Sequence, residues 1–278
     1  MTYSINCNGK LHTFNQAIIM GILNATPDSF YNQGRDSEPE ALLEKAAQMV
    51  QEGVTIIDVG GLSTRPGADS IPVNEEIERI EPVIKRLKKN FPELLVSIDT
   101  YRAEVAKAAV NSGADIINDI SAGEMDPDMV STVSQLKVPY IAMHMQGKPQ
   151  TMQKEPKYKQ VTEVVLAYFQ QKIAALREAG IKDIIIDPGF GFGKSLAHNY
   201  TLLKEMHVFQ TLQVPVLVGI SRKSMIYNIL GSNAREALNG TTAVHMLALQ
   251  QGAQILRVHD VKEAKECIQI FNFYSSNT

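Results

Sequence analysis

The stretch Gly53-Val-Thr-Ile-Ile-Asp58 decides the fold of this chain, because its pattern returns along the sequence. The same succession of a glycine, an apolar run and a polar residue occurs at residues 113–118, 180–187 and 252–257. Each glycine follows a helix-like segment, and glycine tolerates the left-handed conformation that ends a helix. The apolar run behind it is typical of a parallel strand that is buried on both faces. The repeating unit is therefore a helix, a glycine, a strand and a polar tip.

Working outward from this unit gives eight strand candidates with helical patterns between them. They cover residues 17–24, 55–61, 94–99, 115–121, 138–144, 183–188, 215–221 and 254–259. Eight alternations in 278 residues favour a closed (β/α)8 barrel of the TIM type, with an open doubly wound sheet as the competing architecture. A small β-hairpin with Asn8-Gly9 at its turn is expected over residues 3–13, before the barrel. No linker divides the chain, so we expect one domain over residues 1–278.

Composition and charge exclude several classes of function. The chain is 44% hydrophobic, and its net charge of -3 provides no basic field for a phosphate backbone, so we expect no nucleic-acid partner. Cys7 and Cys267 lie near opposite ends and indicate free thiols rather than a disulfide framework. The first residues lack a signal-peptide pattern and the apolar runs are too short to cross a bilayer, which predicts a cytoplasmic protein without a membrane partner.

Polar residues stand at the tip of every predicted strand. They are Asn24, Asp58, Asp99, Asn118, His144, Asp187, Ser221 with Lys223, and Arg257 with His259. In parallel barrels the active site lies at the carboxyl ends of the strands, so these side chains are expected to converge. Buried carboxylates beside cations indicate a flat ligand rich in N–H donors that also carries anionic groups. A pterin ring fits this description, and so does a purine or another guanidine-like group.

Longer strings of residues around these tips resemble those of dihydropteroate synthases and occur in that family's order. The strings are Gly21-Ile-Leu-Asn-Ala-Thr-Pro-Asp-Ser-Phe30, Asp58-Val-Gly-Gly-Leu-Ser-Thr-Arg-Pro-Gly67, Ser97-Ile-Asp-Thr100, Ile117-Asn-Asp-Ile120, Asp187-Pro-Gly-Phe-Gly-Phe-Gly-Lys194 and Gly219-Ile-Ser-Arg-Lys-Ser224. The resemblance extends from the first strand to Arg257-Val-His-Asp260 and so covers nearly the whole chain. Several strings are too long to match by coincidence.

The resemblance implies that 6-hydroxymethyl-7,8-dihydropterin diphosphate is joined to p-aminobenzoate with release of pyrophosphate and with assistance from Mg2+. It implies catalytic roles for Asp99, Asp187, Lys223 and Arg257, and a pterin pocket of Asp99, Asn118, Met143, Asp187 and Lys223. The implied diphosphate ligands are Asn24, Thr64, Arg65, Arg257 and His259, with Asn24 also the ligand of the metal. The implied surroundings of p-aminobenzoate, where sulfonamides compete, are Thr64, Arg65, Pro66, Phe192 and Ser221. A homodimer is implied as well.

The chain departs from the family pattern at two places. Tyr31-Asn32-Gln33 replaces the usual Ser-Asp-Gly and removes a carboxylate from a loop over the site, and Leu62 stands where many members have glutamate. The first departure leaves a non-catalytic pterin-binding protein as an alternative. A methyltetrahydrofolate-dependent corrinoid methyltransferase is the other alternative, although it would not need Arg65, Arg257 and His259 for a diphosphate. The run from Gly189 to Lys194 lacks the spacing of a nucleotide-binding loop and is interpreted as a backbone-limited loop.

Overall fold

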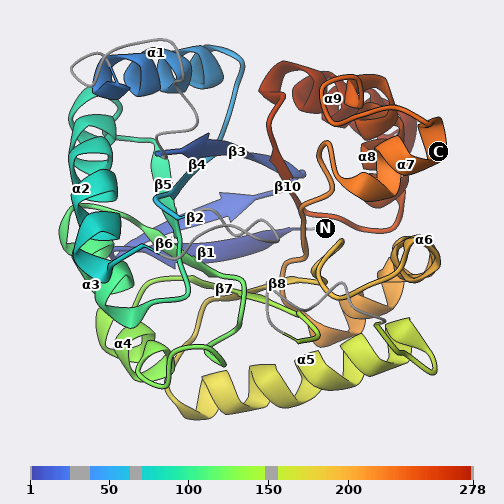
Figure 1. Ribbon diagram of the computed structural model, residues 1–278, viewed down its shortest axis with the longest axis horizontal. Coiled ribbons are helices and arrows are strands. Elements are labelled where there is room, and N and C mark those ends of the chain that lie inside the picture. The colour runs from blue at the N-terminus through green and yellow to red at the C-terminus, as the bar shows by residue number, and fades with distance from the viewer. Residues whose placement is uncertain (1, 26–37, 63–70, 148–155, 277–278) are drawn as a thin grey trace.

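Eight parallel strands form a nearly closed barrel in this protein, as seen in a computed structural model that describes residues 2–25, 38–62, 71–147 and 156–276 (Figure 1). The strands are β3 (Ile18–Asn24), β4 (Ile56–Gly60), β5 (Leu95–Asp99), β6 (Ile116–Asp119), β7 (Tyr140–Met143), β8 (Ile184–Asp187), β9 (Leu217–Val218) and β10 (Ile255–Val258). Their order in the sheet is β8-β7-β6-β5-β4-β3-β10-β9, and one bridge between Ile186 and Val216 joins the two edges. The eight predicted strands and the barrel are confirmed, and the open-sheet alternative is wrong.

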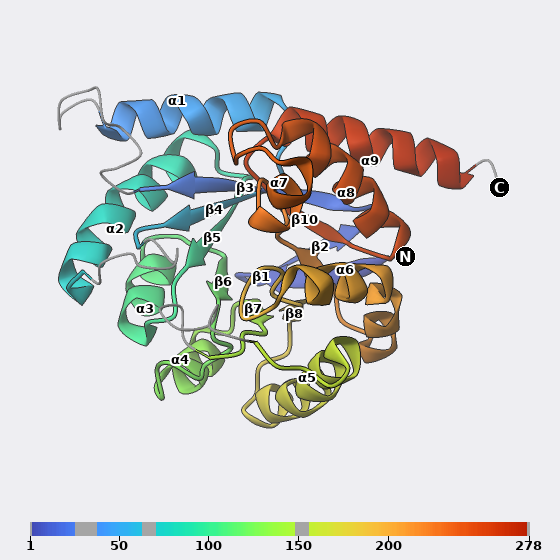
Figure 2. The same ribbon diagram turned by 45° about the vertical axis from the view of Figure 1, so that its right-hand side comes forward.

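Helices surround the strands, as Figures 1 and 2 show from two directions. They are α1 (Glu38–Gln51), α2 (Val73–Asn90), α3 (Ala103–Asn111), α4 (Met129–Leu136), α5 (Val161–Glu178), α6 (Leu196–Lys204), α7 (Ser224–Leu230), α8 (Leu238–Gln250) and α9 (Val261–Ser276), with a 3-10 helix η3 (Met206–Leu212). The outward-facing strand residues and the inner faces of the helices form the main apolar core. In the part of the chain that the structure describes, no helix is long and apolar enough to cross a membrane.

The four glycines of the repeated unit end their helices in the same way. Gly53, Gly113, Gly180 and Gly252 all have positive φ angles. At Gly53 the backbone N–H donates to Val50 O, and the next N–H, of Val54, donates to Met49 O. The other three glycines repeat both bonds, which together form the Schellman motif. The predicted helix stops are confirmed, and each one turns the chain directly into a strand.

A two-stranded hairpin closes the amino-terminal end of the barrel. Its strands are β1 (Tyr3–Cys7) and β2 (Lys10–Phe14), which pair with Cys7 opposite Lys10. The two turn residues Asn8 and Gly9 both have positive φ, as a tight hairpin requires. Ile5 and Cys7 pack against the first inward residues of the barrel strands. The predicted hairpin is confirmed, and both cysteines are buried free thiols.

The barrel interior changes from apolar to polar along the strands. Its lower layer contains Ile18, Met20, Ile56, Leu95, Ile116, Ile141, Ile185, Leu217 and Ile255. Because successive strand residues alternate between faces, residues two or four further along point to the same interior. Those positions are Asn24, Asp58, Asp99, Asn118, Met143, Asp187, Gly219 and Arg257. The alternation therefore places the polar tips together above an apolar floor, at the carboxyl ends of the strands. His144 is the exception to this prediction, because Met143 takes the inward position and His144 packs against Tyr168 and Lys194.

Candidate active site

Arg257 joins two carboxylates across the polar layer of the barrel. Its Nε donates to Asp58 Oδ2 at 2.6 Å, and its Nη2 donates to Asp99 Oδ2 at 2.7 Å. Asn118 Nδ2 donates to the same oxygen of Asp58 at 3.0 Å. Although burial opposes it, the attraction of Asp58 and Asp99 raises the pKa of Arg257 above its ordinary value. Two of the predicted site residues, Arg257 and Asn118, are thus linked through Asp58, a strand tip to which the sequence analysis assigned no role.

Both carboxylates keep one oxygen without a hydrogen-bond partner. Asp58 Oδ1 and Asp99 Oδ1 are buried and accept no hydrogen bond from the described residues. Burial raises the pKa of Asp99 to about 7, while Arg257 acts in the opposite direction and the nearby Asp58 charge adds to the rise. A buried acceptor without a donor is unfavourable by about 1–3 kcal/mol. A ligand that brings N–H groups to this layer would remove that penalty.

Asp187 and Lys223 lie on the opposite side of the layer. Asp187 Oδ1 accepts from Gly189 N at 2.8 Å, and burial raises the pKa of Asp187 against the attraction of Lys223. Burial has the opposite effect on an ammonium group and lowers the pKa of Lys223 to about 8, while the attraction of Asp187 opposes this shift. Lys223 Nζ donates to Phe190 O and lies 4.6 Å from the centre of the Phe192 ring. Lys223 is therefore a partly buried cation held between the carboxylate layer and the glycine-rich loop.

Gly219 leaves this part of the barrel open. A Cβ atom added at Gly219 would lie 3.7 Å from Asp187 Oδ2 and 4.0 Å from Lys223 Nζ. Met143, which ends strand β7, is buried and supplies an apolar side chain at the same level. A flat ring could thus contact a carboxylate, an ammonium group and an apolar surface together.

Ser221 and His259 are paired where β9 and β10 end. Ser221 Oγ accepts from His259 N at 3.2 Å and lies 3.0 Å from His259 Nδ1. Ser221 Oγ and His259 Nδ1 share one hydrogen bond, whose direction depends on the tautomer of the ring. Desolvation of the ring and the charge of Arg257 lower the pKa of His259 to about 4 although the residue as a whole is exposed, so the ring is neutral at physiological pH.

The turn between Ser221 and Lys223 is fixed by an arginine. Arg222 has a φ of 55°, which is unusual for a residue other than glycine. Its guanidinium group donates to both oxygens of Asp260 at 2.8 Å, and its backbone N–H donates to Thr241 Oγ1. The bidentate ion pair ties the turn after β9 to the end of β10 and holds Lys223 and His259 beside the same opening.

Asn24 ends strand β3 at the rim of the layer and is partly exposed. A Cβ atom added at Gly60 would lie 3.6 Å from Asn24 Oδ1 and 3.9 Å from Asp99 Oδ2, so both oxygens face the small space over Gly60. Within the described ranges, no three His, Cys, Asp or Glu side chains form a group that could hold a metal ion.

Some predicted residues cannot be placed. Thr64, Arg65, Pro66 and the departure at residues 31–33 lie outside the described residues, whereas Leu62 is described and partly buried. Sequence reasoning also missed Lys194, which is buried beside His144 and the glycine-rich loop. The available signal was a lysine at the end of a glycine run directly after a strand tip.

Comparisons with known proteins agree with this geometry. The family described as Pterin binding enzyme matches residues 20–259. Dihydropteroate synthase of Escherichia coli (strain K12) is 44% identical over 254 residues, which are 91% of this chain and 89% of that protein. Dihydropteroate synthase of Xanthomonas albilineans, solved with 4-aminobenzoic acid, has a TM-score of 0.92 at 39% identity and covers 99% of both chains. The same enzyme in complex with 7,8-dihydropteroate has a TM-score of 0.88 at 36% identity, again over 99% of both chains. The chain belongs to the dihydropteroate synthase family of pterin-binding enzymes.

Proposed function

We propose that this enzyme condenses 6-hydroxymethyl-7,8-dihydropterin diphosphate with p-aminobenzoate to give 7,8-dihydropteroate and pyrophosphate. The observation that carries the proposal is the polar layer, where two buried carboxylates keep unpartnered oxygens beside one arginine and one lysine. The carboxylate oxygens are acceptors for the N–H groups of a pterin, and the arginine and the lysine are cations for its diphosphate. The relatives solved with 4-aminobenzoic acid and with 7,8-dihydropteroate support the same substrate and product.

The carboxylates both bind the ring and favour the reaction. Asp99 and Asp187 accept hydrogen bonds from pterin N–H groups. Asn118 forms hydrogen bonds with a neighbouring edge of the ring, and Lys223 donates to a ring acceptor. When the bond between the pterin methylene and the diphosphate breaks, positive charge develops on the ring system. Fixed carboxylates in a buried site stabilise that charge more in the transition state than in the ground state. The amine of p-aminobenzoate then forms the new carbon–nitrogen bond, so no nucleophilic side chain of the enzyme is required.

The diphosphate is expected to lie at the rim near Asn24, Arg257 and His259. His259 is neutral and has one ring N–H to donate, while Arg257 retains its charge because it is paired with Asp58 and Asp99. The amide oxygen of Asn24 is a ligand that Mg2+ accepts, and diphosphate oxygens and water would supply the rest. When bound, the metal would neutralise charge on the departing pyrophosphate. Ser221 and Phe192, with Thr64, Arg65 and Pro66, are proposed to surround p-aminobenzoate.

The first experiment follows both products. The purified protein is mixed with dihydropterin diphosphate, p-aminobenzoate and Mg2+, and dihydropteroate is measured by mass together with pyrophosphate. We expect product only when both substrates are present, loss of product with a chelator, and competition between a sulfonamide and p-aminobenzoate. Pterin binding without product would instead favour the non-catalytic alternative. Methyl transfer from methyltetrahydrofolate to a corrinoid protein would favour the other one.

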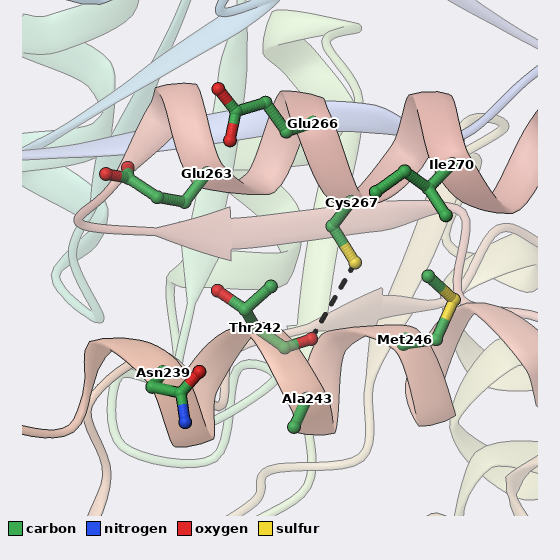
Figure 3. Close-up of a pocket in the computed structure, with 8 residues that line it drawn as sticks. All are labelled: Asn239, Thr242, Ala243, Met246, Glu263, Glu266, Cys267 and Ile270. Carbon is green, nitrogen blue, oxygen red and sulfur yellow. Dashed lines mark hydrogen bonds between the residues drawn. The ribbon is translucent and has the colours of Figure 1, made fainter.

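We also propose that the enzyme is a homodimer that uses helices α7, α8 and α9. Among the described residues, these helices carry most of the exposed large apolar side chains: Ile229, Leu230, Leu247, Ile270, Phe273 and Tyr274. Figure 3 shows the groove between α8 and α9, where Cys267 lies opposite Thr242 and the acidic Glu263 and Glu266 line one side. Sedimentation of the wild type at the mass of two chains, and of Leu247→Glu at the mass of one, would support this interface.

Three further proposals are less specific. The whole chain, residues 1–278, forms one pterin-binding domain, which predicts a single cooperative unfolding transition. The protein acts in the cytoplasm, and cell fractionation tests this. It has no nucleic-acid or membrane partner, and pull-down from nuclease-treated and untreated lysate tests that.

A further inference from the structure

Lys194 is a buried lysine at the junction of two loops. It follows the glycine-rich loop after β8, and its side chain points toward His144, at the end of β7. Its Nζ lies 2.9 Å from Gly189 O, 3.1 Å from Phe192 O and 3.0 Å from His144 Nδ1. No bond to a carboxylate is among these contacts. Burial lowers the pKa of Lys194 to about 7 while the charge of Asp187 opposes the shift, so the charged form depends on the groups that surround it.

The contacts match the donors of an ammonium group. An ammonium group has three N–H donors, and the three shortest contacts are two carbonyl oxygens and one imidazole nitrogen. His144 can accept only while it is neutral, and burial together with the Lys194 charge lowers its pKa to about 3. If the ammonium group were removed, Phe192 O would lose this donor and Gly189 O would keep only the bond from Phe192 N.

The loop at residues 189–193, whose carbonyl oxygens contact Lys194, has no space to move toward the segment that follows β7. A Cβ atom at Gly189 would lie 1.9 Å from His144 O, and one at Gly193 would lie 2.4 Å from Gln146 O. The two backbones are therefore in direct contact along the loop. Lys194 joins the two segments because it donates to the carbonyl oxygens of Gly189 and Phe192 and contacts the ring of His144.

The same loop holds groups of the site. Gly189 N donates to Asp187, Phe190 O accepts from Lys223 Nζ, and the Phe192 ring lies beneath that ammonium group. Asn199, on helix α6, supports the loop from outside by accepting from Gly191 N at 2.7 Å. The position of the Lys223 ammonium group thus depends on a loop whose inner side is fixed by Lys194.

We propose that Lys194 is a positioning residue for the condensation, acting through the loop at residues 189–193 to hold Lys223 and the Phe192 ring where pterin and p-aminobenzoate meet. This inference rests on the proposed function. The contacts of Lys194 are with the loop and His144, and its proposed effect passes through Phe190 O and Phe192. It therefore differs from Lys223, whose own ammonium group faces the ring.

Lys194→Met tests the proposal, because methionine keeps the length of the side chain without its donors. Lys88→Met is the matched control: Lys88 donates to Leu94 O at 3.0 Å and to Asp115 at 2.9 Å, near the amino-terminal ends of the strands. Both variants should unfold at lower temperature. Only Lys194→Met should weaken binding of 6-hydroxymethylpterin, measured by calorimetry, and raise the KM for p-aminobenzoate, each at least tenfold. Lys88→Met should keep both values within twofold of the wild type.

His144→Leu is the second variant, and it decides the question if Lys194→Met does not fold. It removes the imidazole acceptor and leaves Lys194 Nζ three carbonyl oxygens, those of His144, Gly189 and Phe192, so we expect a threefold to tenfold loss in the same two measurements. Wild-type pterin affinity and KM in either folded variant, or equal losses in Lys88→Met, would overturn the proposal. If the wild type bound pterin but formed no product, the proposed function would fail, and the calorimetric comparison would still decide the role of Lys194.

Discussion

Replacing Asp58 by asparagine tests whether the negative charge of Asp58 organises the pterin pocket. Asp58 is completely buried, and its Oδ2 accepts from Arg257 Nε at 2.6 Å and from Asn118 Nδ2 at 3.0 Å. Asparagine has the same shape but no charge and only one oxygen. Arg257 and Asn118, which share Oδ2 of Asp58, would then share a neutral amide oxygen in place of a charged one, and the amide nitrogen would take the position of Oδ1.

The size of the effect follows from these contacts. A hydrogen bond to a charged group contributes about 1.5–3 kcal/mol, and removing one member of a buried ion pair destabilises by about 3–5 kcal/mol. Since Asp99 remains as a partner of Arg257 and one oxygen remains at residue 58, we expect a loss of about 2–4 kcal/mol in unfolding free energy. Roughly 1.4 kcal/mol corresponds to a factor of ten in rate. If stabilisation of the transition state falls by most of the same amount, kcat/KM should fall about 30-fold or more.

The assay measures dihydropteroate formation and urea unfolding on the same preparations. Asp119→Asn is the control, because Asp119 is equally buried but accepts from Tyr140, Ser121 and Gly123 on the outer side of the barrel. We expect both variants to lose stability and only Asp58→Asn to lose kcat/KM. Wild-type kcat/KM in Asp58→Asn, or a matching kinetic loss in Asp119→Asn, would refute the reasoning.

Three other outcomes follow from the same site. Pterin affinity should fall below pH 7, because Asp99 has a pKa raised to about 7 and accepts N–H groups best when ionised; calorimetry across pH should show this acidic limb in the wild type and not in Asp99→Asn. Arg257→Ala should weaken binding of the pterin diphosphate more than that of the unphosphorylated pterin, and should move the acidic limb to higher pH, because Arg257 lowers the pKa of Asp99. Lys223→Ala should lower pterin affinity at least 100-fold while the far-ultraviolet circular dichroism stays that of the wild type.

The sequence alone determined the order and kind of the secondary structure. Local physics was sufficient there, because a glycine after an amphipathic helix ends it and an apolar run behind it forms a buried strand. The structure trimmed the predicted strands at their ends, most of all the strand over residues 215–221, of which only Leu217–Val218 remains. Pro215 has no N–H to donate, and Gly219 begins the turn toward Lys223. Such limits depend on the pairing partner rather than on the residues themselves.

The set of strand-tip residues was also available from the sequence, because residues at even spacing from the apolar floor must face the interior. Their pairing was not available. Only the closed barrel brings Arg257 to Asp58, 199 residues earlier, and leaves one oxygen of Asp58 and of Asp99 without a donor. Lys194 shows the same limit: its position after a strand is visible in the sequence, but its burial between two loops follows from backbone contact at Gly189 and Gly193. Periodicity fixes which way a side chain points, whereas its partners and its pKa depend on which distant segments the fold packs against it.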